Sequence, residues 1–124
     1  MLNEPIRAAY KAAIEAVYTA GQVYSGRVLD VRDVTEYVSV YMASGQFHRP
    51  ISGQLAELGT ECELFITIAK SDATDEQLDA IATLIMTAIE AAPTPCRQPM
   101  PTAFEYGQNE DNMNTLTLTY QVLF

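Results

Sequence analysis

The clearest pattern in the chain is an apolar alternation that passes directly into a helical repeat. Over residues 60–71 the alternate apolar positions are Cys62, Leu64, Ile66 and Ile68. Such a period of two is typical of a half-buried strand. Thr74 and Gln77 then form the signature of a capping box, so a helix is predicted to begin near Asp75 and to run to about Ala92. Each element has one apolar face, and each must pack against the other or a neighbour.

A second amphipathic helix is predicted over residues 4–20. Pro5 suits its first turn, and Gly21 is the predicted C-terminal cap. Its apolar stripe consists of Ile6, Ala9, Tyr10, Ala13, Ile14, Val17 and Tyr18. Charged residues lie off this stripe, so the helix is expected to pack by one face only.

Three further segments have strand patterns. Residues 22–29 contain Gly26 and are predicted to be an edge strand or an extended arm, and residues 102–106 a short strand. Residues 36–44 alternate more firmly, and place Tyr37 and Tyr41 on the face opposite Val38 and Val40. Two alternatives remain open for the tyrosine face, which is covered either by the subunit's own helices or by another subunit.

The chain also ends on an apolar alternation. Its members are Leu116, Leu118, Tyr120, Val122 and Phe124. Residues 107–114 before it predict a polar acidic turn, and the four prolines within residues 93–101 predict an irregular crossover.

Residues 45–59 predict a long loop between two strands that are expected to pair. They contain three glycines and no regular period, and connections of this length inside a compact domain are usually functional or disordered. The simplest interpretation is a hairpin whose tip projects from the body. Phe47, His48, Arg49 and Ile51 lie in this tip, where apolar residues favour ordering against a partner.

Together these elements predict a single α+β domain over residues 1–124. It is expected to be a two-layer fold, with a mixed, largely antiparallel sheet of four or five strands, two helices packed on one face, and a long hairpin loop. The chain has 124 residues, which suits one domain with a sizeable core.

Charge and composition limit the kinds of binding partner and the cellular location that can be expected. The formal net charge is −9, from 16 acidic and 7 basic residues, so the surface repels nucleic-acid phosphates. No apolar run approaches the ~20 residues of a membrane span, and no export signal is visible. Cys62 and Cys96 do not form a disulfide framework, so free thiols and synthesis in the cytoplasm are expected.

No catalytic, cofactor or metal site is predicted. His48 is the only histidine and has no partner at metal-ligand spacing, and residues 109–112 lack the spacing and glycine of a calcium loop. Phosphate-binding loops and nucleophile elbows are absent from the sequence. Two classes remain, a structural assembly subunit and a small-molecule-binding regulatory or enzymatic α+β domain. The second would need a pocket with converging polar groups.

The order and spacing of short motifs favour the first class. They follow the N-terminal helix in the order YSGR at 24–27, VYM at 40–42, ELFI at 63–66, DEQLDAI at 75–81 and LTYQV at 118–122. In this arrangement the chain resembles the tail terminator proteins of long-tailed phages, specifically the lambda-type minor tail protein U family. The resemblance covers nearly the whole chain.

The resemblance implies a structural virion protein that is not an enzyme. Such a subunit assembles as a hexameric ring on the last ring of the tail-tube protein, ends tube polymerisation, and presents a surface to the head-side connector or neck protein. DNA passes through the ring without specific binding, and the expected location is the head-proximal end of the tail. The alternative within this class is a head-tail connector or tail-completion subunit of related fold.

A ring needs head-to-tail contacts between unlike patches. The candidates for these contacts come from three sources: the few basic residues, the tyrosine face and the predicted loop tip. The predicted interface residues are Arg27, Arg32, Tyr37, Tyr41, Phe47, His48, Arg49 and Ile51.

Overall fold

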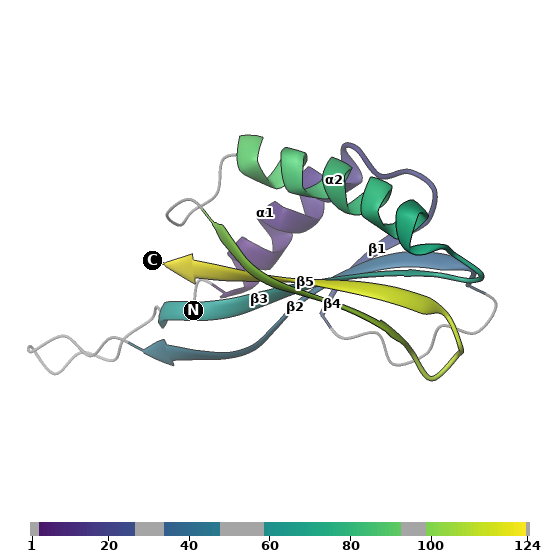
Figure 1. The fold of residues 1–124 in the computed structure, drawn as a ribbon. Coiled ribbons are helices and arrows are strands. Elements are labelled where there is room, and N and C mark those ends of the chain that lie inside the picture. The colour runs from purple at the N-terminus through teal and green to yellow at the C-terminus, as the bar shows by residue number, and fades with distance from the viewer. Residues whose placement is uncertain (1–2, 27–33, 48–58, 93–98, 124) are drawn as a thin grey trace, which may run out of the picture.

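Two helices lie on one face of a five-stranded sheet (Figure 1). A computed structural model describes residues 3–26, 34–47, 59–92 and 99–123. The elements are α1 (Asn3–Glu15), β1 (Gln22–Ser25), β2 (Glu36–Phe47), β3 (Gly59–Lys70), α2 (Asp75–Ala91), β4 (Met100–Gln108) and β5 (Asn114–Leu123). The predicted α+β fold with a mixed sheet is confirmed. No helix in the described ranges has the length and apolar character needed to cross a bilayer.

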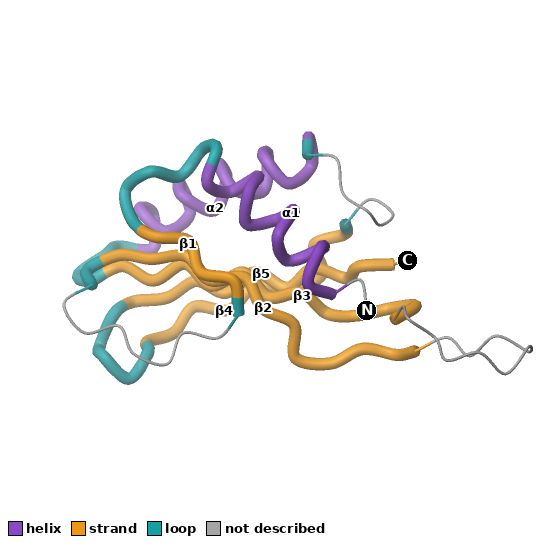
Figure 2. The backbone as a smooth tube through the Cα atoms, turned by 180° about the vertical axis from the view of Figure 1, so that it is seen from behind, coloured by secondary structure: helices purple, strands orange, loops and turns teal. Residues whose placement is uncertain are grey.

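The sheet order is β1-β2-β3-β5-β4, with β1 parallel to β2 and the other neighbours antiparallel. Helix α2 therefore connects two parallel strands, β3 and β4, and β5 returns between them. Helix α1 packs over β1 and β2, whereas α2 packs over β3 and β5. Figure 2 shows α1 above β1 from behind, so the two helices divide the sheet between them and β4 lies beyond both.

The core fills the space between the helices and the sheet. The predicted alternations supply it, because the helix-facing residues of β3 and β5 are buried. The residues with at most 2% of their surface exposed include Ile6, Tyr10, Ile14, Val38, Val40, Leu64, Ile66, Ile68, Leu78, Ile85, Ile89, Leu116, Tyr120 and Val122. Fully burying one such aliphatic side chain contributes about 1.5–3 kcal/mol, so this layer dominates the stability of the domain.

The capping box predicted for α2 is present. Thr74 Oγ1 accepts a hydrogen bond from the Gln77 backbone N–H at 3.2 Å, and Gln77 Oε1 accepts one from the Thr74 N–H at 3.1 Å. The helix begins at Asp75, as predicted. Two of the first unpaired N–H donors are thereby satisfied.

Helix α1 ends earlier than predicted, at Glu15 instead of residue 20. Its last turn closes through the hydrogen bond from the Tyr18 N–H to the Ile14 carbonyl, and Val17, predicted for the stripe, is exposed. Gly21 is not the helix cap. A Cβ at this position would lie 2.4 Å from the Glu36 carbonyl oxygen, so the glycine allows the chain to enter β1 close beside β2.

Strands β2 and β3 form the predicted hairpin, but they extend further than expected. Gly45 to Phe47 and Gly59 belong to the strands, because β2 accommodates register shifts between Met42 and Ser44 and between Gln46 and Phe47. The connection at residues 48–58 lies outside the described residues. Strand β4 is also longer than the predicted 102–106, whereas β1 is an edge strand as predicted.

Candidate interaction surface

The tyrosine face of β2 points away from the helices. Val38 and Val40 face the helix layer, so Tyr37 and Tyr41 lie on the opposite side of the sheet. Coverage by the subunit's own helices is therefore wrong for this face. Tyr37 is nevertheless only 6% exposed, because it packs with Ala69 and Met113. Tyr41 is half-buried and stacks on Phe65, with ring centroids 5.3 Å apart.

The acidic turn between β4 and β5 is held by one asparagine. Asn109 Oδ1 accepts hydrogen bonds from the N–H groups of Asp111 and Met113, and Asn109 Nδ2 donates to the Tyr37 hydroxyl at 3.2 Å. These bonds explain the polar cluster as a turn that closes over Tyr37. Across the described residues, no three His, Cys, Asp or Glu side chains converge to hold a metal ion.

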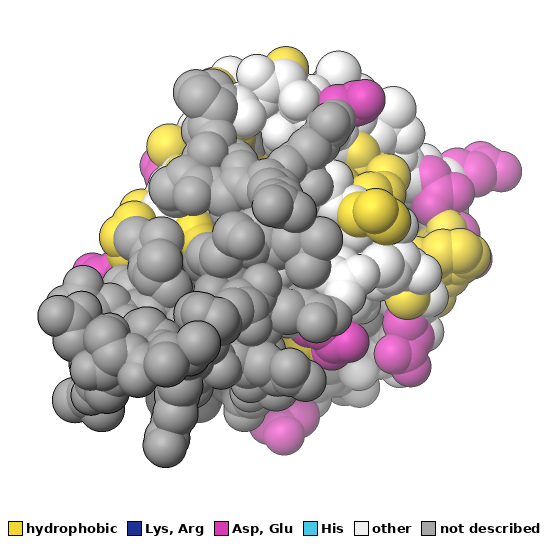
Figure 3. All heavy atoms as spheres, turned by 90° about the vertical axis from the view of Figure 1, so that its left-hand side faces the viewer, with side chains coloured by type: hydrophobic (Ala, Val, Ile, Leu, Met, Phe, Trp, Pro, Cys, Tyr) yellow, Lys and Arg dark blue, Asp and Glu magenta, His cyan; other side chains and the backbone are white. Residues whose placement is uncertain are grey.

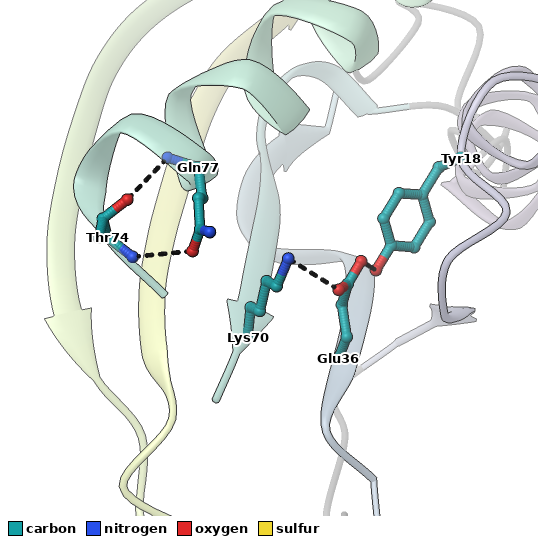
Figure 4. Close-up of polar contacts among 5 residues, drawn as sticks. All are labelled: Tyr18, Glu36, Lys70, Thr74 and Gln77. Carbon is teal, nitrogen blue, oxygen red and sulfur yellow. Dashed lines mark hydrogen bonds and ion pairs between the residues drawn. The ribbon is translucent and has the colours of Figure 1, made fainter. Parts of the chain in front are cut away.

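A cluster of three polar side chains, Tyr18, Glu36 and Lys70, connects the segment after α1 to the sheet (Figure 4). The Tyr18 hydroxyl donates to Glu36 Oε2 at 2.5 Å, and Lys70 Nζ lies 3.5 Å from Glu36 Oε1. Burial and the hydrogen bond to Glu36 raise the pKa of Tyr18 well above its ordinary value, so its hydroxyl stays protonated. Glu36 thus contacts both Tyr18 and Lys70, and these contacts connect the segment after α1 to strands β2 and β3.

Three of the five large apolar side chains that are exposed in the described ranges lie on β4. All nine residues of this strand are exposed, Met100, Phe104 and Tyr106 among them. The register places Phe104 opposite Leu118 and Tyr106 opposite Leu116, so these side chains share the helix-facing side of the sheet. Leu118 is 6% exposed and Phe104 is 69% exposed. The cover supplied by α2 therefore ends between β5 and β4.

An open groove of about 560 Å³ follows the line between α2 and β4. Met86 and Ala82 form its helix wall, and Phe104 and Tyr106 form its strand wall. The Tyr106 hydroxyl donates to Asp79 Oδ1 across it, and this hydrogen bond raises the pKa of Tyr106. The polar residues of its lining are Asp79, Thr83, Thr102 and Tyr106, and the hydrogen bond between Tyr106 and Asp79 engages two of them with each other.

A second hollow of about 360 Å³ lies nearby along the same two elements. Met86 lines both hollows, and the second also has Glu90 and Met100 on its walls. Tyr120 closes its base, where burial and the charge of Glu90 raise the pKa of Tyr120 to about 12. The two hollows together make one apolar surface with acidic side chains, which we call the α2/β4 groove.

Charge is uneven over the described surface. Helix α2 and strand β4 contain no lysine or arginine, and their acidic residues are Asp75, Glu76, Asp79, Glu90 and Glu105. Figure 3 shows acidic and apolar side chains next to each other on one end of the molecule, with no described Lys or Arg side chain in view.

The predicted interface residues are only partly placed. Arg27, Arg32, His48, Arg49 and Ile51 lie outside the described residues, as does the side chain of Phe47. Tyr37 is buried within the subunit, and Tyr41 is available only in part.

Sequence reasoning missed the α2/β4 groove. Phe104 and Tyr106 already alternate in the predicted strand at 102–106, and this was the available signal. Which strand becomes the sheet edge depends on the strand order, however, and the strand order cannot be predicted from the apolar pattern of one strand.

Comparison with known proteins places the fold. No model of a known protein family matches the chain, and no curated protein matches it significantly. A chain in the virion of a native gene transfer agent particle is similar in structure, with a TM-score of 0.65 and 13% identity over 97% of this chain and 94% of its own.

A chain of the PVC sheath/tube terminator of an extracellular contractile injection system, in its extended state, is also similar. Its TM-score is 0.52 at 11% identity, and the match covers 98% of this chain and 56% of that one. This chain therefore spans little more than half the length of that terminator chain. The fold described above is thus one that occurs in a virion and in a sheath/tube terminator.

Proposed function

We propose that this chain is a tail terminator subunit, a structural virion protein that caps the tail tube. In this role six copies form a ring on the last ring of tube protein, end tube polymerisation and present the surface that joins the head-side connector. The observation that carries the proposal is the likeness to a sheath/tube terminator chain over 98% of this chain. The match to a virion chain over nearly its full length supports the same assignment.

The chemistry of the surface suits this role. A ring around a DNA path should not retain the polyanion, and a chain with net charge −9 repels phosphates at short range. No bond is made or broken in this role, so the proposal needs only surfaces for copies of the chain, the tube and the connector. The exposed α2/β4 groove and Tyr41 are candidate surfaces among the described residues.

Tail length tests the proposal. Deleting the gene for this chain from the particle that encodes it should give tails of irregular, greater length without heads, because nothing ends tube growth. Electron microscopy of negatively stained lysates measures both features. Supplying the wild-type chain in trans should restore uniform, headed tails. Headed tails of normal length in the deletion strain would contradict the proposal.

A further inference from the structure

The sheet has two unlike edges, and one of them lacks a covering layer. At the β4 edge, Phe104 is 69% exposed although it faces the same side as buried Leu118. Contiguous exposed apolar patches mark interaction sites, and aromatic residues are enriched in such interfaces. Strand β4 is also the outermost strand and has no partner beyond it in the described sheet, so its outer backbone groups are available for pairing.

The charge of the α2/β4 groove limits what can fill it. Asp79 and Glu90 lie on its walls, and neither α2 nor β4 supplies a positive charge to balance them. An apolar occupant with positive charges at its rim would complement this surface. A second copy of the same groove would not, because a twofold contact would bring the acidic walls together.

The opposite edge of the same chain has the complementary character. Helix α1 lies over β1 and β2 at that edge (Figure 2). It carries Arg7 and Lys11 one turn apart on the same side, in the middle of the helix, whereas its acidic residues Glu4 and Glu15 lie at the two helix ends. Neither forms an ion pair with any residue that the structure describes, and Lys70, the other basic side chain in those ranges, is paired with Glu36. Exposed Ala8 and Ala12 give α1 a shallow outer surface that allows close approach.

We propose that the α2/β4 groove of one copy receives the α1 edge of the next copy, so that Arg7 and Lys11 lie beside the acidic walls. This inference rests on the proposed ring function and deepens it by naming the two surfaces that meet. The contact is heterologous, because a groove meets a helix, and a repeated heterologous contact closes into a ring when its rotation allows. The incoming helix would cover the side of β4 that α2 leaves bare (Figure 1).

Two surface variants and their mixture test the contact. The groove variant carries Phe104→Ser and Glu90→Gln, and the helix variant carries Arg7→Glu and Lys11→Glu. The control is Leu84→Ser, which removes an apolar side chain that is 54% exposed on α2 and does not line the groove. All the altered side chains are exposed or partly exposed, so circular dichroism should show the wild-type fold for each variant.

Sedimentation velocity over rising concentration supplies the readout. The wild type and the control should self-associate, and each variant alone should associate on the order of tenfold or more weakly. The mixture should form a 1:1 heterodimer that does not grow, because the helix variant keeps an intact groove and the groove variant an intact helix.

Three results would overturn the inference. They are a wild type that stays monomeric up to its solubility limit, variants that associate like the control, and a mixture without a heterodimer. If a different protein filled the groove, or if two copies met in a twofold contact, at least one of these three results would be observed. The tail-length test is independent of them: long headless tails together with any of these results would reject the surfaces named here and leave the terminator role standing.

Discussion

Tyr120 shows how a single residue links the core to the candidate surface. Its ring lies in the helix-facing row of β5 and is 2% exposed, yet it also closes the hollow that Glu90 lines. Burial disfavours the phenolate, and the nearby carboxylate disfavours it further, so the pKa of Tyr120 rises from 10.0 to about 12. The folded chain therefore holds this proton more tightly than the unfolded chain does.

This difference predicts a loss of stability in alkali. The contribution of Tyr120 is complete below pH 10 and is lost as the pH rises from 10 towards 12, because the unfolded chain releases the proton first. Tyr120→Phe should flatten the decline of unfolding free energy between these pH values, as measured by urea denaturation. Some slope should remain, since Tyr18 contributes with the same sign. Parallel profiles for the variant and the wild type would contradict the assignment.

At the scale of elements, α2 is the best-specified part of the chain. It begins with a complete capping box, its acidic residues Asp75 and Glu76 lie in the first turn where the helix dipole favours them, and one stripe enters the core. All of these signals are local in sequence, which is why the start of α2 was predicted correctly. Its crossover from β3 to β4 also sets the position of the groove.

The cap gives a stability prediction. Thr74→Ala removes the acceptor for the Gln77 N–H and should lower the unfolding free energy by about 1 kcal/mol. Thr87→Ala is the matched control, because Thr87 is exposed within the same helix and alanine has the higher helix propensity there. Urea denaturation of both variants measures the difference. Equal unfolding free energies for the two variants would argue against a stabilising cap.

Elements whose limits depend on distant residues were predicted less well. Gly21 resembled a helix cap in the sequence, but the close approach of the Glu36 carbonyl explains it, and that contact is known only from the fold. Strand β4 was predicted too short, because Pro101 weakens the pattern and an edge strand tolerates it at a register shift.

At the scale of the whole molecule, the apolar periods predicted the layer architecture, and topology decided the surface. The alternations in β3 and β5 and the stripe of α2 required a helix layer on a sheet, as found. They did not reveal that β4 lies at the sheet edge, where neither helix buries its residues. A surface created by strand order carries no local signature, so the α2/β4 groove became visible only with the fold.

The two edges of the molecule also explain why one chain would build a closed assembly. The acidic α2/β4 groove and the α1 surface with Arg7 and Lys11 lie near opposite edges of the sheet, and such unlike patches favour rings over twofold dimers. The pairing of two unlike patches depends on both edges of the sheet, so neither edge alone would produce it.

The proposed role requires six copies of this chain to form a ring that ends the tail tube. Cryo-electron microscopy of intact particles tests it most directly, because a reconstruction of the junction between tail and head shows which chains are present and how many. We expect one ring of six copies between the last tube ring and the head-side connector. Copies distributed along the tail, or none at the junction, would contradict it.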